Sequence, residues 1–249
     1  KNMIVDVARE FVELEEMVRV AEELYGPYRW ERHDILVLPP SFPFGGMENP
    51  RLTFATPTII AGDRSLVALV AHELAHSWSG NLVTNATWEE FWLNEGLTVY
   101  FERRIMEELR GPQYAKMLSV IGHQDLIANI EKLEKAGRSQ DTRLKLDLTG
   151  RNPDDGMSVV PYEKGYALMI LIENMVGRKK LDMFLQHYFG TFSFQTMTTQ
   201  RFVAYISEEL LDPEGVFVDF KSWLHGEGIP EDLIVPKSIL LAQVDSEIK

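Results

Sequence analysis

The sequence predicts a mostly helical α+β domain with a small β element near its start. Three observations support this fold class. Apolar residues recur at spacings of three and four along most of the 249 residues. Only two short segments, 35–38 and 51–56, have the composition of strands. A content of 45% hydrophobic and 25% charged residues is typical of a soluble globular protein with a substantial core.

The elements are expected in a simple order along the chain. A first helix begins near Ile4 and ends at Gly26 and Pro27. Two strands follow, and the segment between them, 42–50, is expected to form neither a helix nor a regular ladder. Thr87 and Glu90 are expected to form a capping box at the start of a later helix. The remaining helices are expected at 65–78, 87–109, 114–136, 162–176, 179–188, 199–210 and 217–224. The polar stretch 137–161 is expected to be a loop, either throughout or with one short strand.

Charge and composition exclude several classes of function. The chain carries 38 acidic and 25 basic residues, a net charge of -13, which argues against nucleic-acid partners and against a polybasic membrane anchor. No apolar run approaches the ~20 residues that a membrane span needs. The absence of cysteine excludes disulfides, thiolate metal sites and a cysteine nucleophile. No signal peptide is visible, so a cytoplasmic location is expected.

The strongest functional signal is the sequence His72-Glu73-Leu74-Ala75-His76. Residues four apart lie on one face of a helix, so both imidazoles can bind one metal ion, and neutral imidazole is a good zinc ligand. Glu73 lies about 100° around the helix from His72, where it can contact a water molecule beside the ion. With six histidines in the chain, the number of H-E-x-x-H matches expected by chance is roughly 0.015. The sequence therefore predicts one zinc ion per chain.

Glu95 is the candidate for the third zinc ligand. It follows His76 after 18 residues, a separation that suits a pair of antiparallel helices facing one ion. The alternative is a solvated helix glutamate. However, Phe91, Trp92 and Leu93 beside it are apolar, and an unpaired carboxylate would be costly to bury among them.

The ends of the chain are typical of a segment taken from a longer protein. Lys1 enters a helical pattern at once, and residues 244–249 have no terminal character. We expect a catalytic domain at 1–235, an exit segment at 236–249, and flanking domains elsewhere in the parent protein.

Five motifs follow one another along the chain: Phe44–Pro50, His72–His76, Ser77–Asn85, Phe91–Thr98 and Val160–Gly165. On these motifs, in this order, the chain resembles the gluzincin zinc aminopeptidases, the aminopeptidase N superfamily, and is most similar to the branch of leukotriene A4 hydrolase and aminopeptidase B. The resemblance covers nearly the whole chain and implies a thermolysin-like catalytic domain.

The resemblance also implies roles for residues outside the zinc ligands. Glu48 would bind the free α-amino group of a peptide, so the enzyme would remove residues from the N-terminus. Tyr162 would donate a hydrogen bond to the oxyanion that forms on the scissile carbonyl, and Glu73 would act as general base. Independently of the resemblance, Glu102 is a candidate partner for a ligating histidine, because such a histidine usually donates its other N–H; an exposed helix glutamate is the alternative. The substrate-binding segment would comprise Gly45, Gly46, Met47, Glu48 and Asn49, whose glycines permit close backbone approach.

Specificity is the least determined part of the resemblance. Asp154 matches a position that lines the substrate pocket and favours basic first residues, although a solvated loop aspartate is an alternative. Met157 replaces a tyrosine of the leukotriene hydrolase branch. Two other functions therefore stay open: a bifunctional enzyme that also hydrolyses lipid epoxides, and an inactive fragment that only binds peptides.

Overall fold

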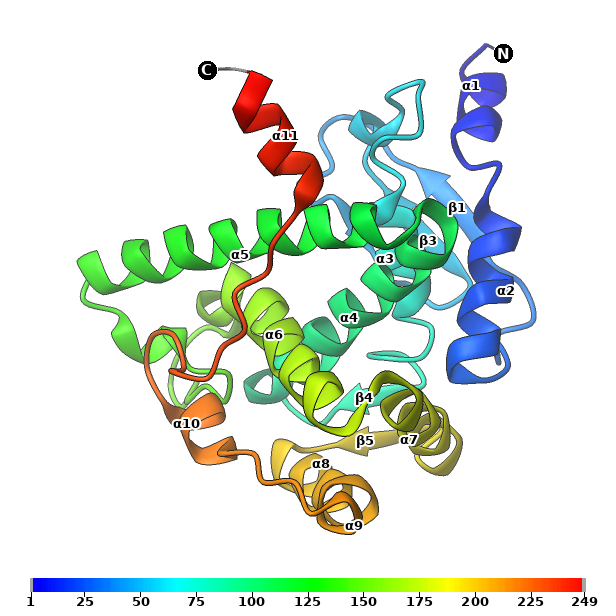
Figure 1. Cartoon of the computed structure of the whole chain (residues 1–249). Coiled ribbons are helices and arrows are strands. Elements are labelled where there is room, and N and C mark those ends of the chain that lie inside the picture. The colour runs from blue at the N-terminus through cyan, green and yellow to red at the C-terminus, as the bar shows by residue number, and fades with distance from the viewer. Residues whose placement is uncertain (1, 248–249) are drawn as a thin grey trace.

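The computed structural model describes residues 2–247, and it confirms the mostly helical fold class (Figure 1). The α-helices are α1 Asn2–Glu10, α2 Leu14–Tyr25, α3 Ala68–Ala75, α4 Phe91–Arg110, α5 Pro112–Lys135, α6 Val159–Val176, α7 Arg178–Thr191, α8 Thr199–Ile206, α9 Asp212–Glu214, α10 Phe220–His225 and α11 Ile239–Glu247. The strands are β1 Asp34–Val37, β2 Gly46–Met47, β3 Leu52–Ala55, β4 Val83–Asn85 and β5 Gln195–Met197. Within residues 2–247, no helix is both long and apolar enough to cross a membrane.

The expected first helix is divided into α1 and α2 by a turn at residues 11–13. Two glutamates, Glu10 before the turn and Glu13 at its last position, explain the break. Glu10 is buried and accepts backbone hydrogen bonds from Gly62 and Arg64 at 3.0 and 2.9 Å. Glu13 instead accepts a hydrogen bond from Arg110 at 2.7 Å. A continuous helix would fix the relative directions of the two side chains, whereas the turn lets each carboxylate reach its own partner.

A small sheet near the start of the chain has the strand order β1-β3-β2. β1 is parallel to β3, with Asp34 opposite Leu52, and β2 is antiparallel to β3, with Gly46 opposite Ala55. The expectation that 42–50 contributes nothing to a ladder was therefore wrong for two residues. The consequence is functional, because β2 lies at the edge of the sheet and immediately precedes Glu48.

Helix α4 lies in the middle of the molecule, with α3, α5 and α6 packed around it (Figure 1). Its apolar residues, including Trp92, Leu97 and Phe101, are almost completely buried. A second sheet, which the sequence did not predict, pairs β4 with β5 in parallel. This pairing joins the segment after α3 to residues more than a hundred positions later, and it supports the loop that leads into α4.

The capping box expected at Thr87 and Glu90 is not formed. Thr87 makes no side-chain cap hydrogen bond, and Glu90 is buried. The Glu90 carboxylate accepts hydrogen bonds from the backbone N–H and the hydroxyl of Thr199, and it also contacts Lys145 at 3.0 Å. A tertiary contact between α8 and the start of α4 has replaced the local one.

The crossing of α4 and α6 gives a first testable prediction. A Cβ atom on Gly96 would lie 2.7 Å from the Cα atom of Gly165, so the two helices touch through their backbones. We expect Gly96→Ala to lower the free energy of unfolding by about 3 kcal/mol, since a well-packed contact would have to open. Gly190→Ala is the control, because it is a helical glycine with nothing within 4 Å of a Cβ.

Urea denaturation of the two variants checks this prediction. Gly190→Ala should be neutral or stabilising by up to about 1 kcal/mol, the intrinsic difference between glycine and alanine in a helix. Equal stability of the two variants would show that the backbone contact between α4 and α6 does not constrain the fold.

Candidate metal centre and active site

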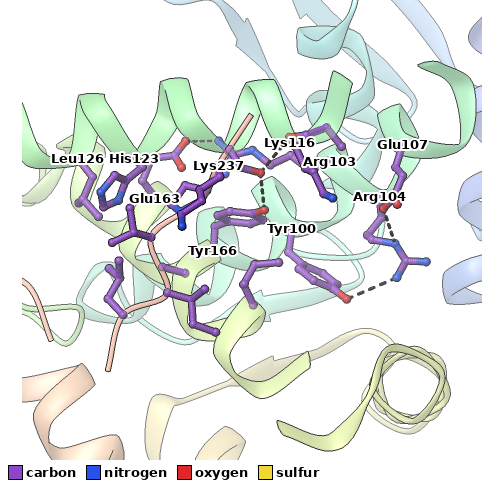
Figure 2. A pocket seen from close by; sticks show the side chains of 18 of the residues that line it. Tyr100, Arg103, Arg104, Glu107, Lys116, His123, Leu126, Glu163, Tyr166 and Lys237 are labelled. Atoms are coloured by element: carbon purple, nitrogen blue, oxygen red, sulfur yellow. Dashed lines mark hydrogen bonds and ion pairs between the residues drawn. The ribbon is translucent and has the colours of Figure 1, made fainter. Parts of the chain in front are cut away.

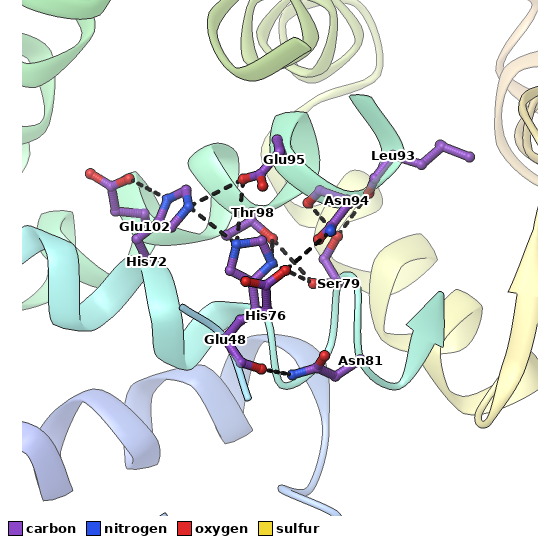
Figure 3. A network of polar contacts seen from close by, with 10 residues as sticks. All are labelled: Glu48, His72, His76, Ser79, Asn81, Leu93, Asn94, Glu95, Thr98 and Glu102. Carbon is purple, nitrogen blue, oxygen red and sulfur yellow. Dashed lines mark hydrogen bonds and ion pairs between the residues drawn. The ribbon is translucent and has the colours of Figure 1, made fainter. Parts of the chain in front are cut away.

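The two histidines of the H-E-x-x-H motif occupy the end of a short buried helix. His72 lies in the last turn of α3, and His76 is the residue that caps its C-terminus. Glu95 lies near the start of α4, the helix that packs against α3. These three side chains, which come from two helices, lie close together at one point in the structure (Figure 3).

Three potential ligand atoms converge between α3 and α4. The Nε2 atoms of His72 and His76 are 3.2 Å apart. One carboxylate oxygen of Glu95, Oε2, lies 3.3 Å from the first nitrogen and 3.4 Å from the second. Although this oxygen is buried, it has no hydrogen-bond partner among residues 2–247. Such an atom is costly to bury unless something positively charged accompanies it.

The other ring nitrogens explain which protonation form suits this arrangement. Nδ1 of His72 lies 3.0 Å from a carboxylate oxygen of Glu102, and Nδ1 of His76 lies 3.0 Å from the carbonyl oxygen of Ser79. Both neighbours are acceptors, so in the neutral, metal-binding form each Nδ1 carries the hydrogen and each Nε2 presents its lone pair to the centre. Two nitrogens and a carboxylate oxygen form a ligand set that fits a zinc ion, with a further position left for a water molecule.

The electrostatics of the cluster agree with a site for positive charge. Burial acts to lower the pKa values of both histidines, but neighbouring carboxylates outweigh it and raise them. These are Glu102 and Glu95 for His72, and Glu95 and Glu48 for His76. Burial acts to raise the pKa of Glu95, but the histidines, His76 first, lower it to about 2. The cluster therefore stabilises positive charge placed among its three ligand atoms.

Glu73 lies beside this centre in a closely fitted position. Its side chain is 6% exposed, and a Cβ on Gly46 would lie only 2.1 Å from its Oε1 atom. Position 46 therefore has to be glycine for Glu73 to stay where it is. The sequence had suggested a close backbone approach at this glycine only for the substrate. Burial is the main cause that raises the pKa of Glu73 to about 7, which suits a group that accepts and returns a proton near neutral pH.

Glu48 is brought to the same centre from the edge strand. Ligand atoms of Glu48, Glu73 and His76 all lie within 4.8 Å of one another. The backbone carbonyl of Glu48 accepts a hydrogen bond from the Asn81 amide at 2.6 Å, and its Oε1 atom accepts one from Asn94 at 3.3 Å (Figure 3). A carboxylate next to a metal centre, but not among its three ligands, is suited to binding a substrate ammonium group.

Tyr162 lies in the first turn of α6, whose start is capped by the Ser158 hydroxyl. Its ring is stacked on that of His72, with 6.1 Å between the centroids, and it meets Phe91 edge to face at 5.9 Å. Burial, followed by the charge of Glu95, raises the pKa of Tyr162 well above its usual value. The hydroxyl therefore keeps its proton and remains a hydrogen-bond donor beside the centre.

The remaining expected substrate residues are less closely associated with the centre. The carbonyl of Gly45 accepts a hydrogen bond from Thr56, the residue after β3, and Met47 pairs with Phe54 within that strand. The backbone of Asn49 accepts a hydrogen bond from Leu52. Asp154 is exposed in a short 3-10 helix, where its backbone N–H is bound by Asn152. The structure does not bring Asp154 into contact with the metal-binding cluster.

Residues that sequence reasoning missed hold the cluster together. Thr98 lies 3.1 Å from Nδ1 of His76 and donates to the carbonyl of Ser79 at 3.3 Å. The Ser79 hydroxyl donates to the carbonyl of Leu93 at 2.9 Å and thereby ties the loop after α3 to α4. Asn81 and Asn94 lie within two of the five sequence motifs. Asn94 could have been identified from the sequence, because it directly precedes the candidate ligand Glu95.

A separate cavity of about 380 Å³ lies between α4, α5, α6 and the segment 233–237 (Figure 2). Arg103 contacts Glu163 there at 2.6 Å and lies over the ring of Tyr166 at 4.0 Å. None of the metal-binding candidates lines this cavity. Its buried ion pair joins α4 to α6 one residue from Glu102 and one residue from Tyr162, so it helps to fix the two helices that carry these residues.

Glu102 gives a second prediction, which concerns its contact with His72. We expect Glu102→Gln to weaken zinc affinity by about 10–100-fold, because a charged acceptor would no longer hold the Nδ1 hydrogen of His72. Competition with a zinc chelator measures this affinity. Glu108→Gln is the matched control, an exposed glutamate on the same helix. Unchanged affinity in Glu102→Gln would exclude a role for this contact in metal binding.

Comparisons with known proteins place this geometry in context. The model of the peptidase family M1 domain matches residues 11–223. A leucine aminopeptidase 2-1 from Meyerozyma guilliermondii is 46% identical over 220 residues, 88% of this chain and 36% of the relative. A leukotriene A-4 hydrolase from Xenopus laevis is 43% identical over 233 residues, 92% of this chain and 38% of the relative. The chain thus spans little more than a third of the length of these relatives.

Solved structures agree with the family match. The native leukotriene A4 hydrolase from Saccharomyces cerevisiae has a TM-score of 0.89 and 40% identity, over 98% of this chain and 39% of that one. An M1 zinc metallopeptidase from Deinococcus radiodurans has a TM-score of 0.68 and 22% identity, over 91% of this chain and 46% of that one, and it supports the fold alone.

Proposed function

Because this chain belongs to peptidase family M1, we propose that it is the catalytic part of a zinc-dependent aminopeptidase that removes the N-terminal residue from short peptides. The observation that carries the proposal is the convergence of His72, His76 and Glu95 on one point, with the unpartnered Oε2 atom of Glu95 between the two imidazoles. These three residues would hold the zinc ion. When bound, zinc polarises a carbonyl and makes water a better nucleophile at neutral pH.

The other residues of the centre would perform the remaining tasks. Glu73 would accept a proton from the attacking water and deliver it to the departing amine, as its position and raised pKa allow. The protonated Tyr162 would donate a hydrogen bond to the carbonyl oxygen as negative charge develops on it. Glu48 would bind the α-ammonium group of the substrate. The free edge of β2 would accept the peptide backbone as an added strand, through Gly45–Asn49.

A panel of aminoacyl-arylamides and peptides tests the function. The protein at its natural length should release the first residue of a free peptide, and an acetyl group on the same peptide should prevent cleavage. An active enzyme that cuts the acetylated peptide equally well would contradict the role of Glu48. A protein that holds zinc and cleaves none of the panel would contradict the peptidase proposal.

A preference for basic first residues is the finer part of the proposal, and Asp154 would provide it. Its support is the excess of negative charge, -13 in the whole chain, which favours cationic substrates. If Asp154→Asn leaves the ratio of kcat/KM for arginyl and alanyl arylamides unchanged, this assignment is wrong. The end of the catalytic domain at residue 235 is also a proposal. A cytoplasmic location is a further one, which cell fractionation would test.

Epoxide hydrolysis is a second candidate function, favoured by relatives that carry the name leukotriene A-4 hydrolase. Met157, which is 44% exposed, stands where that branch has a tyrosine, and we therefore expect this activity to be absent. Incubation of the peptidase-active protein with a fatty-acid epoxide, followed by analysis of the products, distinguishes the two possibilities.

A further inference from the structure

The side chain of Glu48 needs a partner that fixes its direction. It is only partly buried, and it follows a strand of two residues. Two asparagine amides supply the contacts: Asn81 donates to the backbone carbonyl of Glu48 at 2.6 Å, and Asn94 donates to its Oε1 atom at 3.3 Å (Figure 3). One holds the backbone and the other holds the carboxylate.

The amide of Asn94 is buried, and its position is set by the start of α4. The residue is 6% exposed and lies in the first turn of that helix, where the Ser79 hydroxyl donates to the backbone carbonyl of Asn94 at 3.2 Å. Within residues 2–247, the side-chain Oδ1 atom has no hydrogen-bond partner. Its Oδ1 atom faces Gly80, at 2.1 Å from where a Cβ would lie, and Gly80 has φ +104°. Rotating the amide by half a turn would place Oδ1 against the carboxylate oxygen, and two acceptors cannot form a hydrogen bond. The donor therefore has to face Glu48.

The neutrality of this donor matters for the chemistry. Among residues 2–247, no lysine or arginine forms an ion pair with Glu48, although most other partly buried carboxylates near the core have such a partner. A guanidinium or ammonium group at this place would fix the carboxylate equally well, but it would also neutralise the charge that attracts a substrate cation. An amide fixes the direction and leaves the negative charge available.

We propose that Asn94 is a positioning residue for recognition of the substrate's free N-terminus: its neutral amide orients Glu48 while leaving the charge of Glu48 for the α-ammonium group. Asn81 assists by holding the backbone of the same residue. This inference rests on the proposed aminopeptidase function. Asn94 contacts the substrate only through Glu48, so its effect should vanish when Glu48 is absent.

A double-mutant cycle tests this dependence. The variants are Asn94→Ala, Glu48→Ala and the double variant, assayed on an alanyl-arylamide in the protein at its natural length. Asn94→Ala should lower kcat/KM about 10-fold, mainly through KM, the loss expected for one hydrogen bond to a charged group. In the Glu48→Ala background the same change should have an effect of less than about 2-fold.

Controls separate positioning from a structural role. Asn85→Ala should leave kcat and KM unchanged, since the side chain of Asn85 donates to the carbonyl of Thr87 at 3.0 Å and, among residues 2–247, makes no hydrogen bond to Glu48 or the zinc-ligand candidates. Zinc content should stay at one per chain in every variant. Asn81→Ala is the independent arm if Asn94→Ala does not fold, and it should also raise KM without lowering kcat.

The outcomes are distinguishable. Effects of Asn94→Ala and Glu48→Ala that are simply additive would overturn the inference, and so would loss of zinc from Asn94→Ala, which would mean that Asn94 acts on Glu95. If Glu48→Ala itself leaves KM for free-amine substrates unchanged, the role proposed for Glu48 fails. If Glu48→Ala raises KM and neither asparagine variant does, only the inference about the asparagines fails.

Discussion

Glu73→Gln should lower kcat by about 10²–10⁴-fold on every substrate that the protein cleaves. Glutamine has nearly the same shape as glutamate and can occupy the closely fitted position beside Gly46. It cannot accept a proton, however, so the attacking water would lose its general base. Initial rates on an aminoacyl-arylamide, at matched zinc content, provide the measurement.

Two controls make this result specific. Glu108→Gln, an exposed change on α4, should retain the wild-type kcat. The zinc content of Glu73→Gln should remain at one per chain, because Glu73 is not among the three converging ligand atoms. A Glu73→Gln protein that keeps more than about a tenth of the wild-type kcat would exclude Glu73 as the general base.

Removing Glu95 should abolish stable zinc binding and with it the activity. In Glu95→Ala, two imidazoles remain without the carboxylate whose charge balances the cation, and a two-ligand site holds zinc weakly. Dialysis followed by metal analysis should find well below one zinc per chain. Added zinc should raise the melting temperature of the metal-depleted wild type, because a ligand that binds only the folded state stabilises it.

The melting-temperature measurement also tests whether Glu95 is a zinc ligand, and it does so independently of catalysis. Zinc should shift the melting temperature of Glu95→Ala by much less than that of the wild type. Equal shifts would show that the ion binds elsewhere. The second cluster, Glu48, Glu73 and His76, would then be the alternative to examine.

The features that the sequence predicted correctly are mostly local. Positions i and i+4 share a helix face in any α-helix, so His72 and His76 could be placed together from their spacing alone. Glu95 could be added because apolar neighbours made a solitary buried carboxylate improbable. The long helices α4, α5 and α6 were also predicted from a local pattern, because their apolar periodicity extends over many turns.

The features that it did not predict depend on contacts between distant segments. β4 and β5 have three residues each, too few to show an alternating pattern, and they form only because residues 83–85 and 195–197 meet. Glu90 has the spacing of a capping residue, but Thr199 is a buried partner that competes for it. The contact of Asn94 with Glu48 joins α4 to the edge of a sheet, and no local pattern reports such a contact.

One measurement tests the central claim most directly: products from a matched pair of peptides, identical except for an N-terminal acetyl group, analysed by mass spectrometry with the zinc-loaded protein at its natural length. We predict stepwise loss of single residues from the free peptide, no cleavage of the acetylated one, and neither reaction after zinc is removed. Cleavage at internal bonds, or cleavage that persists without zinc, would contradict the assignment of His72, Glu73, His76, Glu95 and Glu48 to one aminopeptidase centre.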